Sequence, residues 1–269
     1  MKRSTGIAAD QKGGAWIHSD PGSGEPHRGS GEETAGRYLI VNADDFGMST
    51  AVNQGVLEAH DQGIVTSASL LVLWPAAAAA AASAACRPRL DLGLHVDLGE
   101  WRWENGGWQT VYRRAPLEDA GAVAAEIERQ IGLFRRLVGR DPTHLDSHQH
   151  VHLDEPARSL IVQGAREIGI PLRGCTPGIR YCGGFYGQTS TGGSLPGAIG
   201  VPALLGILDG LSTGVTELGC HPGAGDGLDS SYGAERILET RTLCDLHVRA
   251  AIDTEGITLC RFTDWRFNR

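Results

Sequence analysis

The segment THLDSHQHVH, residues 143–152, concentrates side chains that can bind a metal or transfer protons. It holds an aspartate and four histidines: His144, Asp146, His148, His150 and His152. Pro142 precedes the segment, so a strand followed by a loop is favoured over a helix. In a strand, Asp146, His148 and His150 would share one face. Packing in a core does not readily explain four histidines and an aspartate within nine residues. We therefore predict a metal or catalytic site.

Three further segments place candidate groups where a buried strand ends. Asp44 and Asp45 follow an apolar run, His95 lies within LGLHVDL, and His221 precedes Pro-Gly. Taken singly, each has a plain alternative, as a helix-capping turn, a satisfied core histidine or a turn residue. The carboxyl ends of parallel strands in an α/β barrel converge on one cavity, so jointly these groups predict one site. Successive residues of a strand point to opposite sides, so Asp44 and Asp45 require different roles.

The chemistry that these residues favour is metal-assisted hydrolysis. A mixed set of imidazoles and carboxylates suits Zn²⁺, Mg²⁺ or Mn²⁺ with a position left open for water, and the sequence does not choose among them. No nucleophile elbow and no Gly-rich phosphate loop is present. Cys220, beside His221, is better explained as a small apolar residue that closes a buried strand.

Composition limits the partners that we expect. The net charge is −8 and no lysine–arginine cluster occurs, so neither nucleic acid nor a membrane is an expected partner. No stretch approaches the roughly 20 apolar residues of a membrane span. Six scattered cysteines without a CxxC pair favour reduced thiols and a cytoplasmic location.

The elements that must position the site alternate along the chain. Residues 1–36 are rich in Gly, Ser, Pro and charge and predict a disordered leader, whereas 37–269 predict a single domain. We expect strands at 38–42, 67–73, 92–96, 143–146, 216–220 and 257–261, and a short one near Leu172. Helices are expected at 50–62, 76–85, 119–138, 155–168, 196–208 and 234–255, the last broken or long. This α/β alternation predicts a (β/α) barrel-like fold of about seven parallel strands, with a doubly wound sheet as the alternative.

Six motifs together resemble the YdjC-like carbohydrate deacetylase family, which includes the chitooligosaccharide deacetylases. They are NADDFG (42–47), GIVTSASLLV (63–72), GLHVDL (93–98), PTHLDSHQHVH (142–152), FYG (185–187) and CHPG (220–223). The resemblance runs in order from about Tyr38 to Phe262. It implies a barrel-like fold of the polysaccharide deacetylase type and removal of acetyl groups from N-acetylated sugars with a divalent metal, Mg²⁺ or Zn²⁺.

Position by position, the resemblance implies that Asp45, His95 and His148 bind the metal. It further implies that Asp44 is the general base and His221 the general acid. Asp146 and His150 are then expected to orient the ligands, although either could exchange roles with a ligand.

Substrate contacts are predicted in two segments. The first, EWRWENGGW (100–108), includes Trp103, whose ring could stack on a sugar or pack on the barrel rim. The second is the Gly-rich segment RYCGGFYGQTSTGG (180–193), expected to be a mobile loop over the site, in which Arg180 and Tyr186 could contact substrate.

The predicted function is hydrolysis of the acetamide of an N-acetylated sugar, an N-acetylglucosamine-containing oligosaccharide or aminosugar metabolite, releasing acetate and a free amine. The alternatives are a metal-dependent hydrolase of another amide or ester and a non-catalytic sugar-binding relative. The expected partner is a small saccharide, and whether the chain forms a homodimer stays open.

Overall fold

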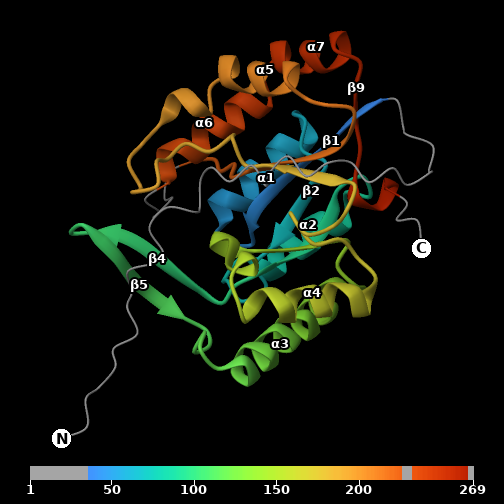
Figure 1. Cartoon of the computed structure of the whole chain (residues 1–269). Coiled ribbons are helices and arrows are strands. Elements are labelled where there is room, and N and C mark those ends of the chain that lie inside the picture. The colour runs from blue at the N-terminus through green and yellow to red at the C-terminus, as the bar shows by residue number, and fades with distance from the viewer. Residues whose placement is uncertain (1–35, 226–231, 266–269) are drawn as a thin grey trace, which may run out of the picture.

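The core of the fold is one curled, parallel sheet that forms a half-barrel (Figure 1). The computed structural model describes residues 36–225 and 232–265. In this part of the chain the order of neighbouring strands is β6–β3–β2–β1–β8–β7, and β9 pairs with the amino half of β1. The strands are β1 (Arg37–Phe46), β2 (Ser67–Leu70), β3 (Asp91–Val96), β6 (Leu145–Ser147), β7 (Ile179–Cys182), β8 (Gly214–Cys220) and β9 (Ile257–Leu259). The predicted parallel, barrel-like α/β fold is confirmed.

Helices cover the outside of the sheet, with α5, α6 and α7 on one side and α3 and α4 on the opposite side (Figure 1). The α-helices are α1 (Thr50–Asp61), α2 (Ala77–Ala85), α3 (Ala120–Val138), α4 (Ala157–Ile168), α5 (Val201–Asp209), α6 (Gly233–Leu243) and α7 (Leu246–Thr254). Short 3₁₀ helices are η2 (His148–Leu153), η3 (Pro196–Ala198) and η4 (Phe262–Asp264). The long helix expected at 234–255 is broken, because Asp245 caps α7 by accepting a bond from the His247 N–H.

Local sequence explains where α3 begins and which face it buries. Asp119 caps its amino end by accepting bonds from the backbone N–H groups of Gly121 and Ala122. The apolar side chains expected on one stripe, Val123, Ile127, Ile131 and Phe134, are all buried.

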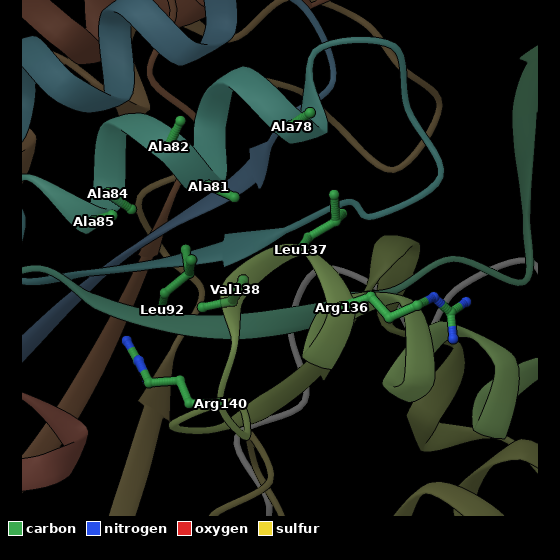
Figure 2. A pocket seen from close by; sticks show the side chains of 10 residues that line it. All are labelled: Ala78, Ala81, Ala82, Ala84, Ala85, Leu92, Arg136, Leu137, Val138 and Arg140. Carbon is green, nitrogen blue, oxygen red and sulfur yellow. The ribbon is translucent and has the colours of Figure 1, made fainter.

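Helix α2 contains only alanines and one serine, and its short side chains leave a cavity of about 400 Å³ against Leu92 and the carboxyl end of α3 (Figure 2). Arg136 and Arg140 line its edge, and no group of the predicted site does.

Within the described ranges no helix has the length and apolar character needed to cross a membrane.

Four elements differ from the sequence-based prediction. Strand β6 ends at Ser147 and His148–Leu153 form η2, so Asp146, His148 and His150 do not share one face of a strand as predicted. The segment at 100–108 is a hairpin of antiparallel strands, β4 (Gly99–Glu104) and β5 (Gly107–Arg113), where no strand was expected. Strand β7 occupies the start of the predicted Gly-rich loop. The strand expected near Leu172 is a single parallel bridge to Leu145. The predicted leader, residues 1–36, lies outside the described residues except for Gly36.

Candidate metal centre

A bulge in β1 turns both adjacent aspartates into the site. Ala43 pairs with Ala68 of β2 but Phe46 pairs with Leu70, so β1 has one residue more than β2 at this point. Asp45 has a φ of 63°, in the left-handed region that aspartate tolerates better than most residues. The strand has therefore already turned at Asp44 and Asp45, which lets successive side chains serve one site in different roles.

Asp45, His95 and His148 bring three candidate ligand atoms together. Asp45 Oδ1 lies 3.1 Å from His148 Nδ1 and 3.4 Å from His95 Nε2, and all three side chains are buried. Two ligands that each lie about 2.1 Å from one ion are about 3.0–3.4 Å apart, so these distances suit a shared divalent ion. His148 Nε2 is buried without a hydrogen-bond partner among the described residues. A buried polar atom without a partner is uncommon and is explained if the ring binds an ion.

A second group, Asp44, His95 and Asp146, also lies close enough to hold an ion. In this group, however, Asp146 Oδ1 already lies 2.8 Å from His95 Nδ1, and both carboxylates are paired with Arg173. Arg173 occupies both oxygens of Asp44, whereas Arg236 bonds only Oδ2 of Asp45 and leaves its Oδ1 to face the two histidines. Asp45, His95 and His148 are therefore the better candidate ligands, and Asp146 bonds the other nitrogen of the His95 ring.

The charge around the site also suits a cation. Three buried carboxylates, those of Asp44, Asp45 and Asp146, face the two guanidiniums of Arg173 and Arg236 in the described structure. Burial raises the pKa of the neighbouring Glu217 to about 7 and that of Glu239 to about 8, so these two carboxyls add only part of a negative charge. Burial would lower the pKa of His95, but Asp146 and Asp45 outweigh it and raise that pKa well above its ordinary value. In the metal-free protein a proton on His95 therefore neutralises part of the negative charge of the carboxylates. A divalent ion that binds His95 would displace this proton.

Asp44 is held by Arg173 through two short bonds. Nη1 and Nη2 of Arg173 lie 2.6 and 2.7 Å from the two oxygens of Asp44, and its Nε lies 2.6 Å from Glu217. Burial would raise the pKa of Asp44, but Arg173 lowers it below its ordinary value. Asp44 is therefore ionised at neutral pH, in a fixed orientation, and able to accept a proton.

His221 directly follows the end of β8 and lies beside Asp44. Its Nε2 is 3.7 Å from Asp44 Oδ2, and its Nδ1 is buried without a partner in the described structure. Its backbone N–H donates to Glu239, and its ring meets Tyr186 edge-on, with 5.3 Å between ring centroids. Burial lowers the pKa of His221 to about 4, so the ring is neutral at pH 7 and free to receive a proton.

Three further residues were predicted to orient the ligands or to contact substrate: Tyr186, His150 and Trp103. Tyr186 is at the site, beside His221. His150 contacts Tyr181 and His152, and makes no described hydrogen bond to a candidate ligand. Trp103 lies on the β4–β5 hairpin.

Arg180 was wrongly predicted to contact substrate. It is exposed and donates to the carbonyls of Ser212 and Thr213, which precede the amino end of β8. The site is at the opposite, carboxyl end of that strand. The prediction failed because Arg180 lies near the start of β7 and its long side chain extends toward the amino ends of the strands, away from the site.

Sequence reasoning missed the two buried arginines. Arg173 follows Leu172, whose bridge to Leu145 extends the sheet beyond β6, so the short strand expected there was a usable signal. Arg236 lies in α6 and donates to Asp45 Oδ2 at 2.5 Å across 191 residues of sequence. Nothing in the local pattern around Arg236 marks it, because a helical arginine usually faces solvent.

Comparison with known proteins places this geometry in a family. The family model described as YdjC-like protein matches residues 38–254. The chain belongs to the YdjC-like family. Proteins named chitooligosaccharide deacetylase from Klebsiella pneumoniae (strain 342) and Serratia marcescens are 32% and 31% identical to it, each alignment covering 85% of this chain and 99% of the relative.

Solved structures give the same fold. A protein of Enterococcus faecalis V583, provisionally described as a cellobiose-phosphate cleavage protein, is 27% identical with a TM-score of 0.68, covering 85% of this chain and 98% of that one. A peptidoglycan N-acetylglucosamine deacetylase superposes with a TM-score of 0.53 at 11% identity, covering 86% and 89%. At that identity the likeness supports the YdjC-like chain's fold alone.

Proposed function

We propose that this YdjC-like protein hydrolyses the acetamide of a small N-acetylated saccharide, releasing acetate and a free amine, with one divalent metal ion. The observation that carries the proposal is the position of Asp44. This ionised carboxylate adjoins the ligand group and lies 3.7 Å from His221, so a base, an acid and a metal position adjoin one another. The chitooligosaccharide deacetylases that resemble the chain support the saccharide substrate.

Asp45, His95 and His148 would hold the ion, which when bound polarises the amide carbonyl and makes water a better nucleophile. Two imidazoles and one carboxylate suit zinc better than magnesium, which prefers oxygen ligands, so we propose zinc with magnesium as the alternative. Arg236 occupies Asp45 Oδ2 and leaves Oδ1 directed at the two histidines.

The proton transfers then follow from Asp44 and His221. Asp44 takes a proton from the attacking water, and Arg173 keeps the carboxylate ionised and oriented until then. The C–N bond breaks only if the nitrogen is protonated, because an amide anion is a very poor leaving group. The neutral His221 ring can receive the proton from Asp44 and deliver it to the departing amine, so protons balance within the site.

Acetate release tests the proposal. The purified chain, stripped of metal and reloaded with zinc or magnesium, is incubated with N-acetylglucosamine, diacetylchitobiose and N-acetylated glycosides, with and without chelator. We expect chelator-sensitive acetate from at least one saccharide and none from Asp44→Asn. Metal-loaded protein that releases acetate from none of them, yet hydrolyses a non-sugar amide or ester, would identify the rival hydrolase function.

A further inference from the structure

The β4–β5 hairpin, residues 99–113, is an arm with one aromatic and one charged face. Trp101 and Trp103 alternate with the charged side chains of Glu100, Arg102 and Glu104 along β4. Trp103 pairs directly with Trp108 of β5, with 5.6 Å between the ring centroids and an interplanar angle of 81°. On the other face, Arg102 lies 3.7 Å from both neighbouring glutamates. Each face therefore has a separate chemical character.

The aromatic face is the one turned toward the body of the molecule. The Trp101 ring is half-buried and packs against the main hydrophobic core, so its face of β4 must face inward. Trp103 lies two residues further on, and Trp108 opposite it, both half-buried, whereas Arg102 and Glu104 are exposed. The arm projects from the sheet (Figure 1), and of its three tryptophans only Trp101 packs against the main core of the described residues.

Two tethers fix the arm, and one of them reaches the metal centre. At the base, buried Asp97 accepts bonds from the Gly99 N–H, the Tyr112 hydroxyl and Arg114 Nε. Further along, the Gln149 side chain accepts from the Trp101 N–H at 2.9 Å and donates to the Trp101 carbonyl at 2.8 Å.

Gln149 directly follows the candidate ligand His148 and has a φ of 49° and a ψ of 30°. This left-handed conformation is uncommon for a residue other than glycine and persists where the surroundings impose it. The two bonds to Trp101 are such a constraint. An isolated two-stranded hairpin is marginally stable in water, so the position of the arm depends on its tethers. Gln149 thus sets the aromatic face at a fixed distance from His148.

We propose that the face formed by Trp103 and Trp108 binds the sugar ring next to the one whose acetamide reaches the metal, and that Gln149 is the positioning residue for this face. The inference rests on the proposed function. Trp101, at the base of this face, is bonded to the residue that follows His148, and the apolar C–H face of a sugar ring stacks on tryptophan whereas its hydroxyls stay in water.

Three variants test the arm: Trp103→Ala, Gln149→Ala and, as a matched control on the charged face of the same strand, Arg102→Ala. Acetate release is measured with N-acetylglucosamine and with diacetylchitobiose. Binding of diacetylchitobiose to metal-free protein is followed separately by titration calorimetry. Zinc affinity of each variant is measured by competition with a chromogenic chelator, and sedimentation gives the oligomeric state.

For Trp103→Ala we expect the KM and Kd for diacetylchitobiose to rise by roughly fivefold to tenfold, with kcat and the monosaccharide kinetics unchanged. Gln149→Ala should shift the disaccharide KM in the same direction with zinc affinity within about twofold of the parent, and Arg102→Ala should change nothing.

Equal losses for mono- and disaccharide, or parental KM values in Trp103→Ala, would overturn the proposal while leaving the deacetylase activity in place. A change of oligomeric state in Trp103→Ala with parental KM values would assign the aromatic face to a second copy of the chain instead. A parent protein that neither binds nor deacetylates any saccharide would refute the proposed function itself, and this inference with it.

Discussion

Arg173 offers the sharpest test of how the site is held together. Its side chain is 1% exposed and pairs with three carboxylates, at 2.6 Å to Asp44, 2.9 Å to Asp146 and 2.6 Å to Glu217. Removing one partner of a buried ion pair costs about 3–5 kcal/mol, because the remaining charge stays buried without compensation. We expect Arg173→Met to lower the free energy of unfolding by about 4 kcal/mol at pH 7.5.

Urea unfolding of the metal-free protein, followed by circular dichroism, measures this loss. With an m value of about 2 kcal/mol/M, the midpoint should fall by about 2 M. The matched control is Arg87→Met. Arg87 also makes two bonds to one carboxylate, that of Asp61, at 2.8 and 2.6 Å, but both side chains are partly exposed. The control should lose at most about 1 kcal/mol.

The pH dependence follows from the lowered pKa of Asp44, where Arg173 outweighs the burial that would raise it. Stabilisation from this pair is present above the ordinary aspartate pKa of about 4 and is lost as pH falls through the lowered folded value. In Arg173→Met, burial acts unopposed and Asp44 binds a proton at higher pH. The deficit of the variant should therefore shrink between pH 7.5 and pH 5. A deficit below about 1 kcal/mol at pH 7.5, equal to that of Arg87→Met, would refute the reasoning.

Three further predictions concern the same site. Asp44→Asn should lower kcat by at least about 100-fold while zinc affinity, measured by chelator competition, stays at the parental value; undiminished turnover would remove Asp44 from the proton transfer. Arg236→Met frees Asp45 Oδ2 to rotate away from its present position, so the same competition assay should give about 10- to 100-fold weaker zinc binding, and parental affinity would contradict this role. Burial raises the pKa of Glu217 to about 7 although Arg173 lowers it, so in metal-free protein its stabilising effect relative to the unfolded chain is present below about pH 4.5 and is lost as pH rises through 7. Glu217→Gln should therefore lose less stability than the parent between pH 5.5 and pH 8 in urea unfolding, and parallel pH profiles would show that Glu217 does not titrate in this range.

Much of the fold was predictable because its signals are local. Apolar runs that end in polar residues mark buried strands, and the stripe from Val123 to Phe134 marks a helix, whatever their neighbours. Parallel strands then bring their carboxyl ends together, so Asp45, His95 and His148 could be assigned to one site without coordinates. The β4–β5 hairpin was not predicted, although the alternation of Trp and charge along β4 leads directly into Asn105-Gly106, a dipeptide typical of two-residue hairpin turns.

The sequence by itself determined which side chains can bind an ion and which strand each one ends, since both depend on residue type and local periodicity. Tertiary structure decided what those side chains touch. Only the folded chain brings Arg173 to Asp44 and Arg236 to Asp45, across 129 and 191 residues, and only the bulge in β1 lets two adjacent aspartates face one site. Tertiary structure also places Arg180 away from the site. The end of the barrel that its long side chain reaches depends on the register of β7 against β8. Such contacts depend on sheet order and register, which no local pattern encodes.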